Sequence, residues 1–308
     1  MTELNPYEPP KSQVALSEQV TFSSELAEPR RVNAGHGVGW IVSGFALFKR
    51  NPWIWILNIF ILMIINGLIG QIPFDIGNIA SPILGPLFGA GLIFGCAVQD
   101  SGNRLKVRYL FAGFKNNTGL LVAVGRFNLL GSIIIFLTIF SLEYLLSGVN
   151  IIDLIRARQS GSPPDPETIR QIIGVLLPSI LVGLALGIPL FMAILFAPTL
   201  VILHSLGAVA AMKLSFRGCL RNIPPFLIYA LVLMVLASII GVLLGVVVPL
   251  FLSFLTQNAG PIVKMLLFPI FFLIMLLSFF GFMSTVVASI YTAYKDIFLK
   301  RADNPLPA

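Results

Sequence analysis

Five long stretches of the chain contain no Lys, Arg, Asp or Glu. They cover residues 51–74, 76–99, 171–203, 222–263 and 265–294. A helix needs about 20 mostly apolar residues to cross a bilayer core of about 30 Å, and each stretch is at least that long. An ordinary soluble domain carries charge on about a quarter of its residues, whereas charged residues make up 11% of this chain and its mean hydropathy is +0.94. We therefore expect an integral membrane protein.

A sixth stretch is interrupted by charge. Residues 118–147 are apolar apart from Arg126 near one end and Glu143 near the other. If both side chains snorkel toward the membrane surfaces, this segment is also long enough to cross. The pattern predicts an all-α polytopic membrane protein with a six-helix transmembrane domain over residues 35–304. The expected helices are 52–72, 82–99, 118–147, 172–204, 224–256 and 262–294.

Two segments are expected to lie outside these helices. The first 34 residues contain four prolines and five glutamates but no apolar run. This composition predicts a disordered cytoplasmic tail rather than a secretory signal peptide. Residues 148–171 mix charges with Ser, Gly and Pro, which is typical of a surface loop, here on the outer side of the membrane.

The basic residues predict the orientation, because Lys and Arg near helix ends are retained on the cytoplasmic side. Fifteen of them lie in the N-terminal segment, the second and fourth loops and the C-terminus, against four in the other loops. Both termini are therefore expected to be cytoplasmic. The net charge is +7, but the positive residues are scattered along membrane-flanking loops. This favours anionic lipid headgroups over nucleic acid as the partner.

A loose seven-residue pattern recurs before the first, third and fifth spans. Each copy ends at an asparagine (Asn51, Asn117 or Asn222), with apolar residues three and six positions earlier beside basic neighbours. Such spacing places the apolar residues on one face of a helix. It predicts three helical hairpins, each preceded by a short amphipathic helix in the cytoplasmic interface, with the Asn as a break or N-cap. The alternative is a chance likeness among aromatic, basic loops that enter a membrane.

Six basic residues in or beside these copies are expected to face lipid headgroups. They are Lys49, Arg50, Lys115, Lys213, Arg217 and Arg221.

Few polar groups within the spans could carry chemistry. Arg126 and Glu143 stand 17 residues apart on one helix, which is about 25 Å of rise, so they cannot pair directly. His204 ends the fourth span, where a half-buried imidazole could titrate near neutral pH. The alternatives are snorkelling for the two charged residues and a satisfied interfacial role for the histidine.

Catalytic machinery is not expected. The chain has two histidines and two cysteines, Cys96 and Cys219, without the spacing of a metal site, and both thiols are expected to stay reduced. Signatures of serine hydrolases, zinc proteases and nucleotide-binding loops are missing. We therefore expect a non-enzymatic protein with no catalytic residue, metal or cofactor.

Several short motifs stand out: Asn5-Pro6-Tyr7-Glu8-Pro9-Pro10, Gly44-Phe45 and Phe48 before Asn51-Pro52, Ala211-Met212-Lys213-Leu214-Ser215-Phe216, and Tyr291-x-x-Tyr294-Lys295-Asp296-Ile297-Phe298. With them the chain resembles an uncharacterised proteobacterial family of polytopic inner-membrane proteins. More distantly it is similar to the membrane-anchor domains of some glycerophosphodiester phosphodiesterases, whose catalytic domain has no counterpart in this sequence. The resemblance implies six helices in a bacterial inner membrane and transfers no catalytic or binding residue.

Two functions follow as expectations. The first is a non-enzymatic protein that organises or senses the bilayer or a membrane partner, which includes a second copy of the chain. The alternative is a transporter or permease for a small or lipophilic solute, in which Arg126, Glu143 and His204 would be the polar groups of a cavity.

Overall fold

The computed structural model describes residues 25–71, 76–146, 166–250, 253, 257 and 261–300. Within these ranges the fold is helical, with one isolated antiparallel bridge between Leu26 and Leu299. The elements in chain order are α1 (His36–Arg50), α2 (Pro52–Gly70), α3 (Ile76–Asp100), the 3-10 helix η1 (Val107–Phe114), α4 (Thr118–Leu146), α6 (Pro166–Leu195), α7 (Ala197–His204), α8 (Ala208–Arg221), α9 (Ile223–Val242), the π-helical turn η2 (Leu243–Val247) and α11 (Pro261–Phe298).

Six helical segments in the described ranges are long and apolar enough to cross a membrane. They are Pro52–Gly70, Ile79–Asp100, Thr118–Leu145, Leu176–His204, Ile223–Leu250 and Pro269–Phe298. The predicted all-α polytopic fold with six membrane-spanning helices is thereby confirmed.

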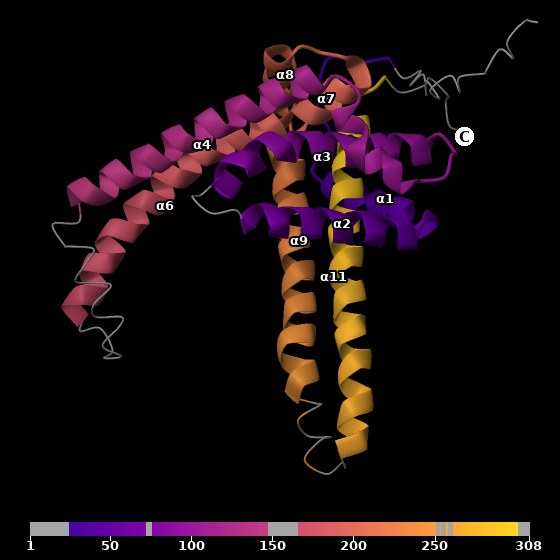
Figure 1. Ribbon diagram of the computed structural model, residues 1–308. Helices are drawn as coiled ribbons and strands as arrows, with labels where there is room; N and C mark the ends of the chain where they lie inside the picture. The colour runs from indigo at the N-terminus through magenta and orange to yellow at the C-terminus, as the bar shows by residue number, and fades with distance from the viewer. Residues whose placement is uncertain are drawn as a thin grey trace, which may run out of the picture.

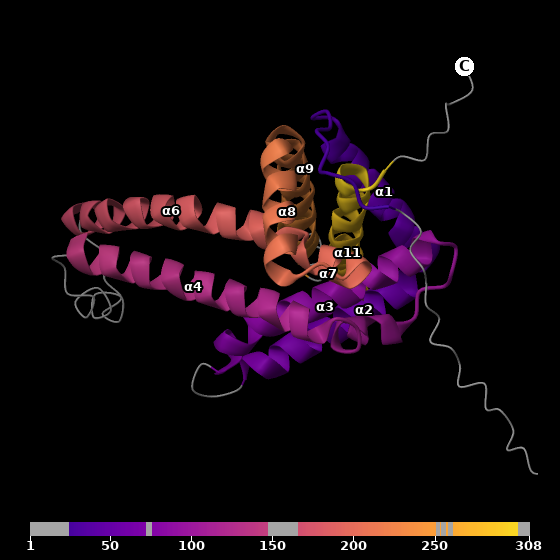
Figure 2. The ribbon, with the colours of Figure 1, turned by 90° about the horizontal axis from the view of Figure 1, so that it is seen from above.

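The long helices form three hairpins that leave a common hub in different directions (Figures 1 and 2). The first hairpin is α2 packed on α3 and the second is α4 packed on α6. In the third hairpin, α9 and α11 run side by side (Figures 1 and 2). The hub consists of the short helices α1, η1, α7 and α8 together with the adjoining ends of the long helices. At 1.5 Å per residue, the 29 residues of α4 and 30 of α6 measure about 45 Å. Helices of that length exceed a core of about 30 Å unless they are tilted, kinked or extended beyond it.

The three short helices that precede the hairpins all pack in the same way, each on a hairpin other than the one that follows it. The 3-10 helix η1 packs on α3 of the first hairpin, and α8 packs on α6 and α4 of the second. The ring is closed by α1, which packs on α11 and α9 of the third hairpin. Each short helix therefore docks on the hairpin of the unit before it. The asparagine-ended pattern thus marks a structural repeat of a short helix and a hairpin.

Glycines allow the short helices to approach the long ones closely. A Cβ added to Gly91 of α3 would lie 2.0 Å from the carbonyl oxygen of Leu110 in η1, and one added to Gly113 of η1 would lie 2.2 Å from that of Leu87. In α1, a Cβ at Gly44 would lie 2.6 Å from the backbone nitrogen of Ser289. Small residues at helix contacts matter most in membranes, where lipid is as apolar as the helices themselves.

The fourth predicted span, 172–204, corresponds to the membrane-spanning segment Leu176–His204. Its helix starts earlier, at Pro166, and is broken at Phe196 into α6 and α7. Pro198 near the start of α7 lacks the N–H that would continue the α6 ladder. The backbone N–H of Phe196 instead donates to Ser215 Oγ at 3.0 Å, and Ser215 donates to the carbonyl of Met192 at 2.7 Å. The break is therefore satisfied by α8, and α7 lies within the hub.

Disorder was expected as far as residue 34, but residues 25–34 are ordered and form a strap across the hub. The backbone N–H of Ala27 donates to the carbonyl of Phe298 at 2.8 Å, and that of Arg30 donates to the carbonyl of Ile297 at 3.0 Å. These bonds tie the strap to the end of α11, which is more than 260 residues away in the sequence. Composition alone does not reveal such a contact. The remainder of the predicted tail, and residues 148–165 of the predicted outer loop, lie outside the described residues. Residues 166–171 of that loop are helical.

Candidate functional site

One face of α1 and the third hairpin enclose an apolar groove, here called groove 1. It has a volume of about 550 Å³. The lining from α1 is Ile41, Val42, Phe45 and Phe48, and the opposite wall comes from Leu233, Leu236, Ile240, Leu277, Ser278, Gly281, Phe282 and Thr285. Groove 1 thus lies where the third hairpin leaves the hub, beside helices that are apolar enough to span a membrane.

A second groove, here called groove 2, lies at the corresponding junction of α8 with the second hairpin. Its volume is about 520 Å³, and it is lined by Phe127 of α4, Ala193 of α6, and Val209, Met212, Lys213, Phe216 and Arg217 of α8. Unlike the α1 wall of groove 1, the α8 wall includes two basic side chains.

The two grooves share three positions of the repeat. When Asn51 is aligned with Asn222, Ile41, Val42 and Phe45 correspond to Met212, Lys213 and Phe216, and all six residues line their grooves. A short helix docked on the preceding hairpin thus leaves the same kind of hollow twice.

At the junction of η1 with the first hairpin, aromatic rings meet at the position that corresponds to the two grooves. Phe111 and Phe114 of η1 align with Phe45 and Phe48. Both rings pack edge-on to Phe88 of α3, with centroid distances of 6.1 and 5.0 Å.

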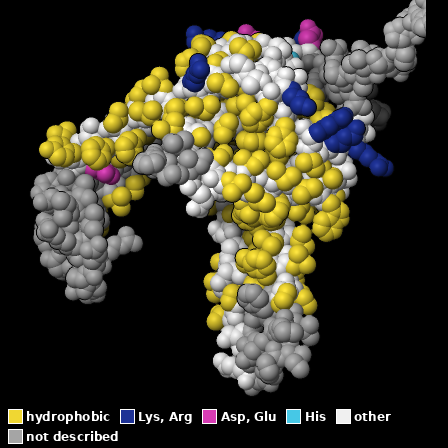
Figure 3. All heavy atoms as spheres, viewed as in Figure 1, with side chains coloured by type: hydrophobic (Ala, Val, Ile, Leu, Met, Phe, Trp, Pro, Cys, Tyr) yellow, Lys and Arg dark blue, Asp and Glu magenta, His cyan; other side chains and the backbone are white. Residues whose placement is uncertain are grey.

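The basic residues predicted to face headgroups all lie on the hub. Lys49 places its Nζ 5.1 Å from the centroid of the Phe45 ring, beside groove 1, and Lys213 and Arg217 line groove 2. Lys115 is exposed at the end of η1. Two are used differently: Arg221 donates to the carbonyl of Pro29 in the strap at 2.8 Å, and Arg50 lines a separate polar hollow. In Figure 3 the basic side chains on the visible face gather around the hub, whereas apolar side chains predominate among the coloured side chains of the hairpins.

The three repeat asparagines all stand at the break between a short and a long helix. In each, the backbone carbonyl accepts the N–H of the residue four positions on. The side chains of Asn51 and Asn222 do not cap the helices that follow. Asn222 is buried instead, accepts from Val32 N–H at 2.9 Å, and donates to the carbonyls of Arg30 and Gly218.

Asn117 stands at the same kind of helix break but differs from Asn51 and Asn222 in its backbone conformation and contacts. Its φ of 53° is in the left-handed region, which Asn tolerates better than most residues. Its amide donates to the carbonyl of Val201 and to Ser205 Oγ, both at 3.0 Å. Asn117 and Asn222 therefore make different side-chain contacts at the same kind of break.

The polar candidates within the spans are not brought together. Arg126 is exposed on α4 close to the hub, Glu143 is half-buried near the far end of the same helix, and His204 ends α7 within the hub. His204 Nε2 is hydrogen bonded to the hydroxyl of Tyr294 in α11. None of the three residues lines groove 1, groove 2 or the polar hollow beside Arg50.

An ionic cluster at the end of α11 escaped the reasoning from sequence. The carboxylate of Asp296 is bound by the Arg30 guanidinium, by His36 Nδ1 at 2.6 Å and by Trp40 Nε1 at 3.0 Å. Its neighbour Lys295 binds the carboxylate of Asp100, to which Tyr291 also donates. Part of this cluster lies in the sequence motif Tyr291 to Phe298. The family resemblance included this motif but implied no role for it.

The two cysteines are buried and free. Burial raises the pKa of the Cys219 thiol from 9.0 to about 12, so this thiol is protonated at neutral pH and is a poor nucleophile. Among the described residues, no group of three or more His, Cys, Asp or Glu side chains is arranged to hold a metal ion.

Comparison with known proteins gives one informative relative. The chain is 27% identical over 217 residues to a protein of Burkholderia thailandensis named "Probable inner membrane protein", a match that covers 70% of this chain and 77% of the relative. No protein-family model and no solved structure matches. Together with the six apolar helices, the likeness supports a multi-pass inner-membrane protein. The similarity to phosphodiesterase anchor domains and the N-terminal motif gain no support from it.

Proposed function

We propose that this protein is a non-enzymatic organiser of the inner membrane that binds anionic phospholipids at groove 1 and groove 2. The observation that carries the proposal is the recurrence of one groove at equivalent positions of the repeat, with Phe45 in one and Phe216 in the other. An acyl chain matches such a groove in polarity, because most of the lining side chains are apolar. The basic residues beside it would select the headgroup.

The groove walls and the basic residues contribute differently to lipid binding, because the solvent around them is lipid. Because lipid tails are as apolar as the groove walls, burying an acyl chain there gains packing rather than hydrophobic energy. Selectivity must therefore come mainly from charge. Each Lys or Arg near an anionic membrane surface contributes about 1 kcal/mol. Lys213 and Arg217 together would then favour an anionic over a zwitterionic lipid by about 2 kcal/mol, or roughly 30-fold.

In this proposal the hub faces the cytoplasm. The support is the gathering of basic side chains on the hub, which the positive-inside rule assigns to that side. Both the strap and the end of α11 belong to the hub, so both chain ends would emerge into the cytoplasm.

The absence of enzymatic activity is also part of the proposal. Hydrolysis or group transfer needs a nucleophile with an acid or base in reach. The Cys219 thiol is held protonated by burial, and the imidazole of His204 is occupied by the hydroxyl of Tyr294. Neither arrangement resembles an activated nucleophile.

The test is lipid retention measured by native mass spectrometry. The protein would be purified in mild detergent and offered equal amounts of phosphatidylglycerol and phosphatidylcholine. We expect the wild type to retain phosphatidylglycerol at a defined stoichiometry. The Lys213→Gln/Arg217→Gln variant should lose roughly 30-fold of that preference at one site. The matched control is Arg104→Gln/Lys106→Gln, which removes two exposed charges of the hub that line neither groove.

Two results would count against the proposal. Equal retention of both lipids by the wild type would remove the anionic preference, and equal losses in the groove variant and the control would show that the grooves are not the sites. A retained small solute in place of lipid would instead favour the alternative of a transporter or permease.

A further inference from the structure

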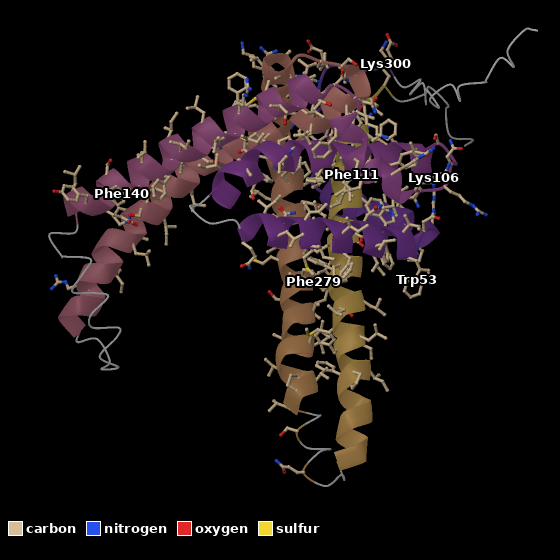
Figure 4. All side chains as sticks on the ribbon, viewed as in Figure 1. Trp53, Lys106, Phe111, Phe140, Phe279 and Lys300 are labelled. Carbon is tan, nitrogen blue, oxygen red and sulfur yellow. The ribbon has the colours of Figure 1, made fainter. Side chains whose placement is uncertain are left out.

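A polar hollow lies on the other side of α1 from groove 1. Its volume is about 740 Å³, and it is enclosed by α1, the end of α3, the last turns of α11 and the strap. The charged residues of its lining are Arg30, Arg50, Lys295, Lys300, Asp100 and Asp296. We call it the cationic hollow. In Figure 4, Lys300 marks its position on the hub, on the side away from the tips of the third hairpin.

The two carboxylates of the cationic hollow are already engaged. Asp296 is bound by Arg30, His36 and Trp40, and Asp100 by Lys295 and Tyr291. These bonds hold Arg30 and Lys295 in place at the wall, while the negative charge of both acids is compensated. An incoming cation would find no free carboxylate here.

The remaining basic groups leave an excess of positive charge. Lys300 pairs with Glu25, and both side chains are largely exposed. Arg50 is exposed at the end of α1 and takes part in none of the ion pairs between described residues. An exposed pair such as Lys300–Glu25 contributes little, so its ammonium group can turn to a ligand at small cost.

We propose that the cationic hollow is a binding site for a phosphate-bearing anion at the hub surface. The volume is within the range of small-molecule sites. The planar guanidinium of Arg50 can donate two parallel hydrogen bonds to a phosphate, and the flexible ammonium group of Lys300 can add a point charge. The phosphate could belong to a soluble cytoplasmic molecule or to a lipid headgroup, and the experiment separates these sources.

This site is distinct from groove 1, although both use α1. Ser43, Ala46 and Arg50 form a stripe at helical spacing that faces the cationic hollow, whereas Val42 and Phe45 face groove 1. The inference therefore does not rest on the lipid-organising function. It would survive if grooves 1 and 2 bound nothing.

The experiment measures binding of inorganic pyrophosphate to the detergent-purified full chain by equilibrium dialysis. We expect saturable binding that weakens about tenfold or more in Arg50→Gln, weakens further in Arg50→Gln/Lys300→Gln, and falls with added salt. Matched controls are Arg104→Gln and Lys106→Gln, which remove exposed charges of the hub outside the lining. Lys106 is labelled in Figure 4. Because Arg50 is exposed, its replacement is expected to leave the fold intact, which the melting temperature checks.

A second arm tests the lipid source. The same variants are placed in nanodiscs of phosphatidylglycerol and phosphatidylcholine, and the anionic lipid retained on extraction is counted. If pyrophosphate does not bind but Arg50→Gln lowers retention of phosphatidylglycerol while Lys49→Gln, beside groove 1, does not, the site holds a headgroup. If pyrophosphate binds and retention is unchanged, the ligand is soluble. If Arg50→Gln and Lys300→Gln match their controls in both arms, the proposal is overturned, whatever the groove variants do.

Discussion

The hub and the outer parts of the hairpins are held together by different forces. Half of the most apolar window of α3, which the hub surrounds, is buried inside the protein, whereas none of the corresponding window of α9 is. Trp55, Leu110 and Phe298 are among the fully buried side chains of the hub. Further out, Phe136 of α4 and Leu250 after η2 are about two-thirds exposed.

This difference shows where each part obtains its stability. The hub contains glycine contacts, buried amide hydrogen bonds and an ionic cluster, and its packing obeys the rules of a soluble core. The outer hairpins satisfy their backbone groups within each helix and leave their apolar side chains to lipid. Substitutions in the hub should therefore change the fold, and substitutions further out should change it little.

The strongest test of this comparison uses two glycines of α3. Gly91→Ala should lower the free energy of unfolding by about 3 kcal/mol, because the new Cβ would lie 2.0 Å from the Leu110 carbonyl oxygen. Gly85→Ala meets no atom within 4 Å and should change stability by no more than about 1 kcal/mol. Thermal unfolding in detergent, followed by size-exclusion chromatography, measures both. Equal melting temperatures would mean that η1 does not dock on α3 as described.

A smaller effect is expected from the repeat asparagines. Asn222→Ala leaves Val32 N–H and the Arg30 carbonyl without their partner, which should cost about 2 kcal/mol and free the strap. Asn51→Ala removes a side chain that makes no cap hydrogen bond and serves as the control. Trypsin cleavage after Arg30 or Arg31, followed by mass spectrometry, should be faster in Asn222→Ala alone. Equal cleavage of the two variants would contradict the anchoring role of Asn222.

The Cys219 thiol gives a milder, pH-dependent test of the hub. Its pKa is about 12 in the folded protein and 9.0 without burial. The folded state therefore disfavours the thiolate, so the contribution to stability is complete below about pH 9 and is lost as the pH rises toward 12. At pH 8, maleimide should label Cys219 only after unfolding in detergent at high temperature. Rapid labelling of the native protein would show that α8 is not packed on α6.

The sequence was sufficient for the spans and the repeat, since both depend on local patterns. Charge-free length identifies a membrane helix without knowledge of its neighbours, and the asparagines at 51, 117 and 222 mark each start of a hairpin. The partners of the short helices could not be predicted in this way. Docking of α1 on α11 joins residues about 250 positions apart, and spacing within α1 carries no information about that distance.

The ordered strap and the ionic cluster were missed for a related reason. Low hydrophobicity around Arg30 predicts disorder when the segment is considered alone, but the carboxylate of Asp296 and the amide of Asn222 supply its missing contacts. The cationic hollow and the two grooves follow from the same long-range docking. A candidate site made by packing between repeat units is therefore visible only once the units are assembled.

The smallest effects are expected from Arg126 and Glu143, although charged residues within spans are costly and often functional. Arg126 is exposed on α4 near the hub, and Glu143 lies near the opposite end of the same helix, so each can reach a membrane surface by snorkelling. Arg126→Ala and Glu143→Ala should change the melting temperature and the retention of phosphatidylglycerol very little. The expected changes are smaller than the scatter between repeated measurements of the control variant Gly85→Ala. Removing a charge from lipid even relieves a desolvation cost, so a slight stabilisation agrees with this view. A loss of stability comparable to that of Asn222→Ala would show instead that α4 buries its charges against protein and would abolish the contrast between hub and hairpins.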